Sequence, residues 1–239
     1  MKNSPQRTVW KDIKAMSMAA AHSFVTDCHQ SIASHGKFVV ALSGGNTPRR
    51  FFELLATQEF SRNIPWKKVF LFWSDERFVS HSSPDSNYNL ARKSLLDRID
   101  IPPGNVFPVP VSGDPEESAR QYEQTIRKFF DNKPASFDWV LLGTGKDGHT
   151  ASLFPNTPVL IENRKLIKQV WVEEKQAWRI TFTYPLINRA RQIIILVSGK
   201  EKEHVVSAVF TKRSRKIFPV QYVQPERSLW IMDEDAAGV

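Results

Sequence analysis

The stretch GTGKDGHTASLFP, from Gly143 to Pro155, combines the residue types of a catalytic loop with those of a tight backbone turn. Asp147 precedes His149 by two residues, and an imidazole titrates near neutral pH, at about 6.5. A carboxylate that orients the ring and stabilises its charged form makes such a histidine a workable general base. The pair therefore predicts proton transfer during a reaction, with Gly145 and Gly148 shaping the loop around it.

The same loop admits other interpretations. Gly143, Gly145 and Gly148 satisfy the G-x-G-x-x-G spacing of a dinucleotide-binding turn. That turn requires an acidic residue at the end of a second strand about 20 residues onward, whereas the following SLFPNTPVLIENRK has prolines and no strand before Glu162. A metal site lacks a third ligand at a recognisable spacing. A structural histidine remains the alternative to a general base.

A second stretch, SGGNTP (43–48), predicts anion binding by the backbone. Its glycines permit tight turns, Thr47 is a good helix N-cap, and Pro48 suits a first helical turn. The free N–H groups and the positive dipole end of such a helix converge on one point, which is how backbone binds phosphate. An ordinary strand-to-helix turn is the alternative. The candidate ligands are Ser43, Gly44, Gly45, Asn46 and Thr47.

A third stretch, SDERF (74–78), places Asp75 and Arg77 directly after an apolar run. Arginine is the side chain best shaped to grip a phosphate or a carboxylate at two points. A surface salt-bridge cluster is the alternative interpretation of the same residues.

Alternating strands and helices must position these loops. Apolar, β-branched runs predict strands at 37–42, 68–73, 137–143, 192–198 and 228–233, and helical patterns occupy 12–34, 48–60, 85–99, 115–131 and 200–210. Strands that are apolar on both faces and alternate with helices indicate an α/β fold: a mostly parallel, twisted, Rossmann-like sheet with helices on both faces. Residues 165–184 predict two further strands, a small antiparallel addition. Ligands of such folds bind at the carboxyl ends of the strands, where the three loops lie.

Taken together, the loops resemble the 6-phosphogluconolactonase family. The matching stretches are LSGGNTP, FWSDERFV followed by HSSPDSNYNLARKSLL, GTGKDGHTASLFP, and WRITFTYPLINRAR followed by ILVSGKEK. They occur in family order from about Val39 to Lys202, and DGHTASLFP is the most specific. Lys146 stands where the family usually has proline, and Asn156 where glycine is common.

The resemblance implies hydrolysis of 6-phospho-D-glucono-1,5-lactone to 6-phosphogluconate, a step of the oxidative pentose phosphate pathway, with no metal or organic cofactor. His149 is expected to activate water and Asp147 to orient its ring. Backbone N–H groups around Gly145 to Gly148, or a nearby cation, would stabilise the oxyanion. The phosphate is expected at the 43–47 loop with Arg77, Lys202 and, because the family motif carries an arginine there, Arg179.

Two rival functions remain. Glucosamine-6-phosphate deaminases share the fold and a similar Asp-Gly-His loop, but continue with asparagine, glutamate and proline where this chain has Leu153, Phe154 and Pro155, and usually carry tyrosine at the position of Arg77. A non-catalytic sugar-phosphate sensor would typically be fused to a DNA-binding segment, whereas the residues before the first core strand indicate one helix with its flanks.

The remaining expectations come from bulk properties. A length of 239 residues predicts one domain, residues 1–239. The net charge of +8 fits an anionic partner such as a phosphorylated metabolite, and the basic run TKRSRK (211–216) lacks the aromatic residues of a nucleic-acid site. With no signal peptide or membrane span, the chain is expected to be a soluble cytoplasmic protein, a monomer or weak homo-oligomer that binds neither nucleic acid nor membrane. Cys28 is expected to pack in the core.

Overall fold

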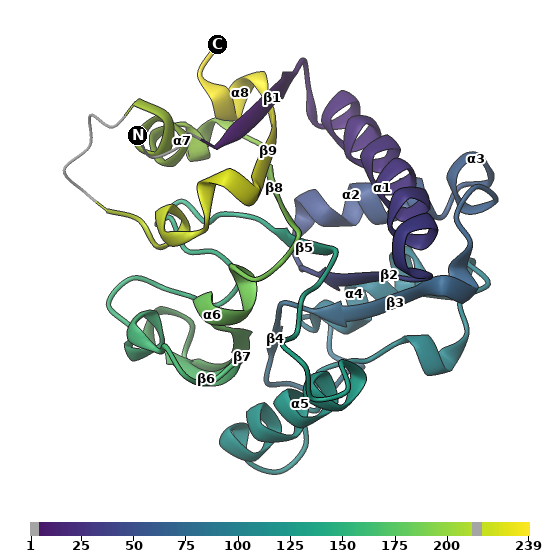
Figure 1. Ribbon diagram of the computed structural model, residues 1–239. Helices are drawn as coiled ribbons and strands as arrows, with labels where there is room; N and C mark the ends of the chain where they lie inside the picture. The colour runs from purple at the N-terminus through teal and green to yellow at the C-terminus, as the bar shows by residue number, and fades with distance from the viewer. Residues whose placement is uncertain (1–4, 212–216) are drawn as a thin grey trace.

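The computed structural model describes residues 5–211 and 217–239, which form two β-sheets with surrounding helices (Figure 1). The larger sheet has six strands in the order β1-β9-β8-β5-β2-β3, and all neighbouring strands are parallel. The smaller sheet is antiparallel, with the order β4-β7-β6. The strands are β1 (Gln6–Trp10), β2 (Phe38–Leu42), β3 (Val69–Trp73), β4 (Asp75–Arg77), β5 (Trp139–Leu142), β6 (Ile167–Val172), β7 (Ala177–Phe182), β8 (Gln192–Val197) and β9 (Ser228–Asp233).

Helices connect the parallel strands and cover the large sheet. Crossovers between parallel strands are right-handed. A helix therefore covers one face of the sheet when the chain moves along the strand order in one direction, and the opposite face when the chain moves back. In Figure 1, α1 and α2 lie together at the upper right, whereas α5, β6 and β7 lie at the bottom. The helices are α1 (Ile13–His35), α2 (Asn46–Leu55), α3 (Gln58–Ser61), α4 (Asn87–Ser94), α5 (Pro115–Phe129), α6 (Tyr184–Ile187), α7 (Glu203–Thr211) and α8 (Glu234–Ala237).

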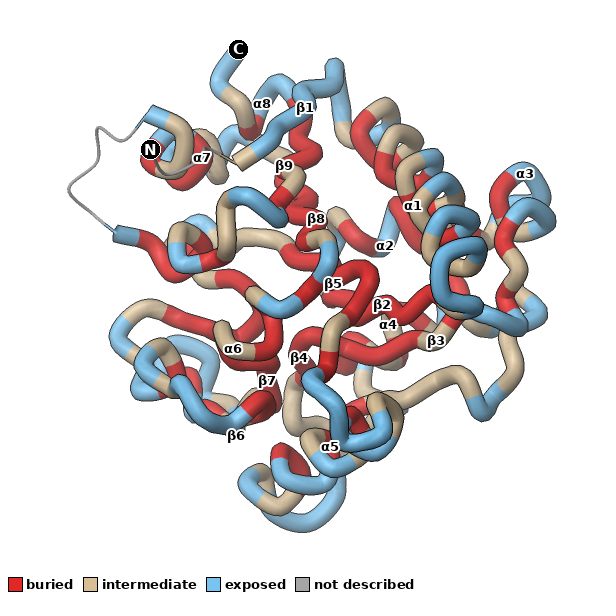
Figure 2. The backbone as a smooth tube through the Cα atoms, in the orientation of Figure 1, coloured by how far each residue is buried: buried red, intermediate tan, exposed pale blue. Residues whose placement is uncertain are grey.

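The central strands are buried on both faces, as their uniformly apolar sequences predict. Every residue of β2 and β5 is buried, and Figure 2 shows these strands in red at the centre of the molecule. Aromatic rings fill the space between α1 and the sheet, where Phe24 makes edge-to-face contacts with Phe38 and Trp139. Cys28 is buried in this core, and burial raises the pKa of its thiol. The predicted α/β class and the core role of Cys28 are confirmed.

Local signals account for the ends of the longer helices. Asp12 caps α1 by accepting hydrogen bonds from the N–H groups of Lys14 and Ala15, and Gly36 ends the helix with a φ of 84°. Asp114 caps α5 in the same way. In the described residues, no helix combines the length and apolar character that a membrane span requires.

Three expectations about the elements need correction. The residues before 37 contain not only a helix but also β1, which pairs with β9; all five of its side chains are exposed, so it lacks the apolar alternation that marks a strand. The predicted antiparallel pair of strands is confirmed as β6–β7, but it joins β4 in a sheet of its own and does not extend the large sheet. The predicted helix 48–60 begins at Asn46 and is broken into α2 and α3. Of the basic run 211–216, residues 212–216 lie outside the described residues.

The strand order creates a crevice at the carboxyl ends of β2 and β5. From β2 the chain passes through α2 to β3 on one side, and from β5 it continues to β8 on the other. The connections therefore leave these two adjacent strands in opposite directions. Such a reversal is where open α/β sheets bind ligands.

Candidate active site

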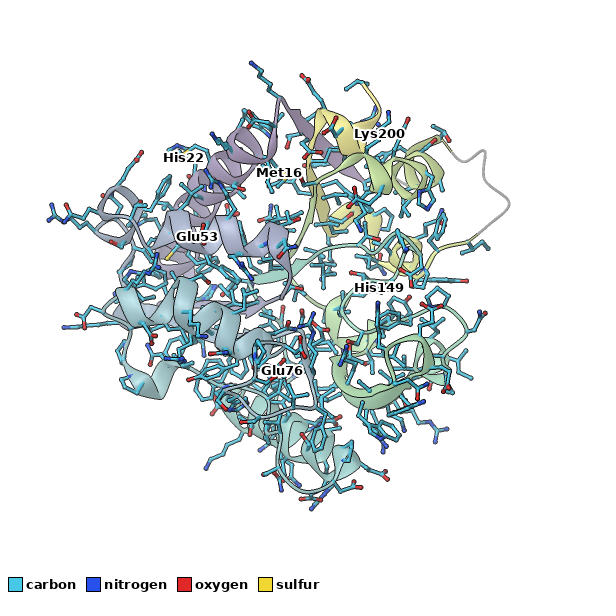
Figure 3. All side chains as sticks on the ribbon, turned by 180° about the vertical axis from the view of Figure 1, so that it is seen from behind. Met16, His22, Glu53, Glu76, His149 and Lys200 are labelled. Carbon is cyan, nitrogen blue, oxygen red and sulfur yellow. The ribbon has the colours of Figure 1, made fainter. Side chains whose placement is uncertain are left out.

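A cavity of about 580 Å³ opens at this reversal point, at the carboxyl ends of β2, β5 and β8. It brings together all three loops singled out from the sequence, together with part of the hairpin β6–β7. In Figure 3, His149 lies near the middle of the face, with Lys200 above it and Glu76 below it. The predicted residues that line the cavity are Ser43, Gly44, Gly45, Asn46, Thr47, Asp75, Arg77, Gly145, His149, Arg179 and Lys202.

The first loop presents the amino end of α2 to the cavity. Gly45 is the N-cap residue, with a φ of 106°, and no side chain caps the helix. The glycine supplies a backbone conformation that other residues rarely adopt, and it leaves the first N–H groups of α2 without a side-chain acceptor. Thr47 was expected to be the N-cap but lies inside the helix, because the turn already begins at Asn46. An uncapped helix start of this kind suits an anion.

His149 and Asp147 form a tight pair in the third loop. Nδ1 of His149 lies 2.6 Å from Oδ1 of Asp147, and both side chains are 28% exposed. Burial opposes ionisation of Asp147, but the hydrogen bond and charge of His149 outweigh it and lower the pKa of the carboxyl. An ionised carboxylate only accepts, so Nδ1 must donate, and Nε2 of a neutral ring then carries the free lone pair. Among the described residues, Nε2 has no hydrogen-bond partner.

Close contacts fix the orientation of the imidazole. Its ring stacks on Phe154, with centroids 4.0 Å apart and planes inclined by 23°. On Gly145, a Cβ atom would lie 2.2 Å from Cε1 and Nδ1 of His149 and 2.4 Å from Oδ1 of Asp147. Gly145 therefore leaves the space that the pair occupies, and no larger residue fits there without displacing the ring.

The backbone of the loop is held by its own hydrogen bonds. The N–H of Gly145 donates to the carbonyl of His149, and the N–H of Gly148 donates to the carbonyl of Gly145. Gly148 has a φ of 78° and packs under Phe218, which would collide with a Cβ there. Because the N–H groups of Gly145 and Gly148 are engaged within the loop, an oxyanion would have to be stabilised by another N–H group of the loop or by a nearby cation. Asp147 and Gly148 lie behind the cavity and do not line it.

The structure accounts for Asn156, one of the two departures from the family pattern, and gives no reason for a lysine at position 146. Asn156 has a φ of 62°, a left-handed conformation that asparagine tolerates better than most residues and that glycine would also adopt without strain. The carbonyl of Lys146 accepts a hydrogen bond from Nε2 of His204 in α7 over 2.7 Å. This contact ties the loop of His149 to the helix that follows β8.

Two arginines face each other across the small sheet. Arg77 of β4 and Arg179 of β7 are direct partners in the strand register, and both line the cavity. Burial, and then the positive charge of Arg77, lower the pKa of the Arg179 guanidinium. Like charges on opposite positions destabilise a sheet. In the described part of the chain neither arginine forms an ion pair, so the two guanidinium groups are suited to an incoming anion.

Asp75 joins the three loops through buried hydrogen bonds. Its Oδ2 accepts from Oγ of Ser152 at 2.6 Å, and its Oδ1 accepts from Nδ2 of Asn87 at 3.1 Å. The amide of Asn87 in turn packs on Gly44, where a Cβ would lie 1.7 Å from Oδ1 of Asn87. The carboxylate of Asp75 in β4 is thus linked directly to the loop of His149 and, through Asn87, to the first loop.

Glu76, directly after Asp75, points away from the cavity and organises the start of α4. It accepts hydrogen bonds from the backbone N–H groups of Arg77, Asn87 and Tyr88 and from the hydroxyl of Ser86. Desolvation raises the pKa of this fully buried carboxyl, although the backbone hydrogen bonds oppose the shift.

Several cavity residues were not predicted as site residues. Asn87 and Ser152 lie inside stretches that matched the family, but their residue types alone suggested no chemistry. Lys175 lies in the turn of the hairpin β6–β7, and Glu201 contacts Lys202, with Oε1 and Nζ 3.7 Å apart. No group of three or more His, Cys, Asp or Glu side chains suited to a metal ion occurs in residues 5–211 and 217–239.

Comparison with known proteins agrees with this geometry. The family described as glucosamine-6-phosphate isomerases/6-phosphogluconolactonase matches residues 11–232. A 6-phosphogluconolactonase from Synechocystis sp. is 44% identical, with 87% of this chain and 86% of that protein covered. One from Nostoc sp. is 41% identical, covering 96% and 95%. The solved structure of 6-phosphogluconolactonase from Trypanosoma cruzi superposes with a TM-score of 0.90 at 28% identity, covering 100% and 97%. The chain therefore belongs to the glucosamine-6-phosphate isomerase/6-phosphogluconolactonase family.

Proposed function

We propose that this protein is a 6-phosphogluconolactonase, which hydrolyses 6-phospho-D-glucono-1,5-lactone to 6-phosphogluconate in the oxidative pentose phosphate pathway. One observation carries the proposal: an oriented imidazole with a free nitrogen shares a cavity with an uncapped helix start and with two arginines that form no ion pair among the described residues. A phosphorylated lactone has one group for each of these features. Its phosphate needs cations, and its ester carbonyl needs only an activated water.

In the proposed mechanism, Nε2 of His149 accepts a proton from water as the water oxygen bonds to the lactone carbonyl carbon. Asp147 holds the ring and stabilises the imidazolium that forms. The tetrahedral intermediate then collapses, the bond from the carbonyl carbon to the ring oxygen breaks, and the imidazolium returns its proton to that oxygen. The products are the free acid and a hydroxyl group, so no other reactant is required.

The phosphate and the oxyanion of the substrate need partners among the cations and N–H groups that line the cavity. Arg77, Arg179, Lys202 and the N–H groups of the 43–47 loop are proposed to bind the phosphate dianion, because guanidinium forks and helix starts are its preferred partners. The oxyanion is proposed to be stabilised by a loop N–H group other than those of Gly145 and Gly148, which are used within the loop, or by a cavity cation that does not bind the phosphate. Asp75, which also lines the cavity, is proposed to accept a hydrogen bond from a sugar hydroxyl.

The deaminase alternative is disfavoured at one position in particular. Phe154 stands where the related deaminases carry a glutamate, and its ring packs against His149. An apolar ring cannot supply the carboxylate that supports ring opening. The cytoplasmic location, the single domain of residues 1–239 and a monomeric or weakly associated state are further parts of the proposal.

The test uses freshly generated 6-phosphogluconolactone and follows acid release above the spontaneous rate. We expect rapid hydrolysis of this lactone and slow hydrolysis of unphosphorylated gluconolactone. His149→Asn should lower kcat by at least about a hundredfold, the scale of a general base, while binding of 6-phosphogluconate stays close to normal. Near-normal turnover in this variant would defeat the assignment of His149, and ammonia release from glucosamine 6-phosphate would favour the deaminase instead.

A further inference from the structure

The cavity wall carries one cation that belongs to none of the stretches shared with the family. Arg77, Arg179 and Lys202 lie in those stretches, whereas Lys175 lies outside them, in the turn of the hairpin β6–β7. Its side chain is exposed, so it stands at the rim of the cavity rather than in its depth. Two glutamates, Glu173 and Glu174, directly precede Lys175 in this turn, but neither forms an ion pair with it.

The carboxylate of Glu173 is engaged by other groups of the hairpin. Its Oε2 accepts a hydrogen bond from Nε1 of Trp171 at 2.7 Å, and its Oε1 accepts one from Nε2 of Gln176 at 2.8 Å. The Trp171 ring is in turn packed edge-on against Trp178 of the facing strand, with centroids 5.6 Å apart. Both oxygens of this carboxylate are therefore directed at groups other than Lys175.

The backbone of the turn is fixed as well. Gln176 adopts a left-handed conformation, with φ 46° and ψ 44°, and its N–H donates to the carbonyl of Glu173. Nε2 of Gln176 donates to the same carbonyl. These bonds close the turn and set the direction in which Lys175 leaves it. Among the described residues, no carboxylate lies within ion-pair distance of its ammonium group.

The hairpin places this charge on the side of the cavity that already holds the arginine pair. Arg179 follows Lys175 by four residues on β7, directly opposite Arg77. A further cation here raises the repulsion between like charges, and it has no ion-pair partner among the described residues. Solvent and salt screen part of this repulsion, and an anion in the cavity would relieve it further.

We propose that Lys175 is a specificity-determining residue at the cavity rim, which attracts the phosphate group of the substrate and helps this protein to select phosphorylated over unphosphorylated lactones. This inference rests on the proposed function. Because the side chain is exposed, it acts mainly on the encounter with the substrate and not on the chemical step. Rim charges change association rates and their dependence on salt more than they change bound-state chemistry.

The experiment compares kcat and KM for wild type, Lys175→Gln and Lys175→Arg on the phosphorylated and unphosphorylated lactones. Lys168→Gln is the matched control, since Lys168 lies on the same hairpin, is paired with Glu162 at 3.9 Å and does not line the cavity. At about 0.01 M ionic strength, where the Debye length is roughly 30 Å, Lys175→Gln should lower kcat/KM for the phosphorylated lactone about two- to fivefold with kcat unchanged. At about 0.15 M the difference should shrink, Lys175→Arg should restore wild-type behaviour, and the unphosphorylated lactone should be unaffected.

The inference is overturned if Lys175→Gln behaves like Lys168→Gln at low salt, or if it impairs both lactones equally. A failure of the proposed function gives a different result, because wild type itself would then not hydrolyse the lactone. In that case calorimetric binding of 6-phosphogluconate still tests Lys175: weaker binding to Lys175→Gln than to Lys168→Gln at low salt supports its role toward phosphate, and equal binding refutes it.

Discussion

Replacing Gly145 by alanine should inactivate the enzyme without unfolding it. The added Cβ would lie 2.2 Å from two atoms of the His149 ring, whereas ordinary contacts begin at 3.4 Å. The ring must therefore move by about 1.2 Å, and displacements of about 1 Å in a catalytic group can cost on the order of a hundredfold in rate. The same Cβ would lie 2.4 Å from Oδ1 of Asp147, so the 2.6 Å bond between the two residues breaks as well. Gly145 does not have a positive φ, so the backbone itself accepts alanine.

Gly143 supplies a matched control in the same loop. It lines the same cavity, also lacks a positive φ, and its added Cβ would meet only the carbonyl oxygen of Leu196 at 3.5 Å. We expect Gly143→Ala to retain activity within a few-fold and Gly145→Ala to lose about a hundredfold or more in kcat. The thermal midpoints of both variants should stay close to that of wild type.

The assay is lactone hydrolysis over a range of substrate concentrations, followed by proton release so that kcat and KM are both obtained, with thermal unfolding measured on the same preparations. Equal activities of the two variants, with both folded, would refute the close-packed geometry assigned to the imidazole. A large loss confined to KM would refute the view that Gly145 serves the chemical step.

Two further predictions concern the buried contacts around the site. Gly44→Ala should destabilise the protein by about 1–3 kcal/mol through overpacking against the amide of Asn87, and this cost should largely disappear in an Asn87→Ala background; additive effects in urea denaturation would show that the contact is absent. Asp147→Asn tests the lowered pKa of Asp147: a depressed carboxyl pKa stabilises the folded state above the ordinary value of 3.8, and this contribution is lost as the pH falls through the folded-state pKa. The stability gap between wild type and Asp147→Asn should therefore be largest near neutral pH and close in acid, and a gap that widens on acidification would contradict the pairing with His149.

The sequence alone predicted the α/β class and the central strands, because strands buried on both faces are continuously apolar and are separated by amphipathic helices. It did not predict β1, whose five exposed residues carry no such pattern and whose strand character depends on pairing with β9. The predicted start of α2 was wrong because it also depends on the surrounding structure. The choice between Gly45 and Thr47 as N-cap depends on how the loop leaves β2, which local preference does not decide.

For the candidate site, residue types and family-like stretches were enough to select Asp147 and eleven residues that line the cavity, His149 among them. Lys175 was missed because a lysine in a polar turn is indistinguishable from a solvated one until the fold brings that turn to the cavity. Asn87 was missed because its role depends on contacts with Asp75 and Gly44, which lie 12 and 43 positions away in the chain.

The sequence by itself determined which chemistry was available: a histidine with a nearby carboxylate, glycines where the backbone must turn closely, and arginine and lysine for an anion. Only the tertiary structure decided which of these groups share a cavity, which N–H groups are already engaged within a loop, and which cations lack a partner. The physical reason is that hydrogen-bond satisfaction and charge pairing depend on distances of a few ångströms between segments far apart in the chain. Local residue preferences carry no information about those distances.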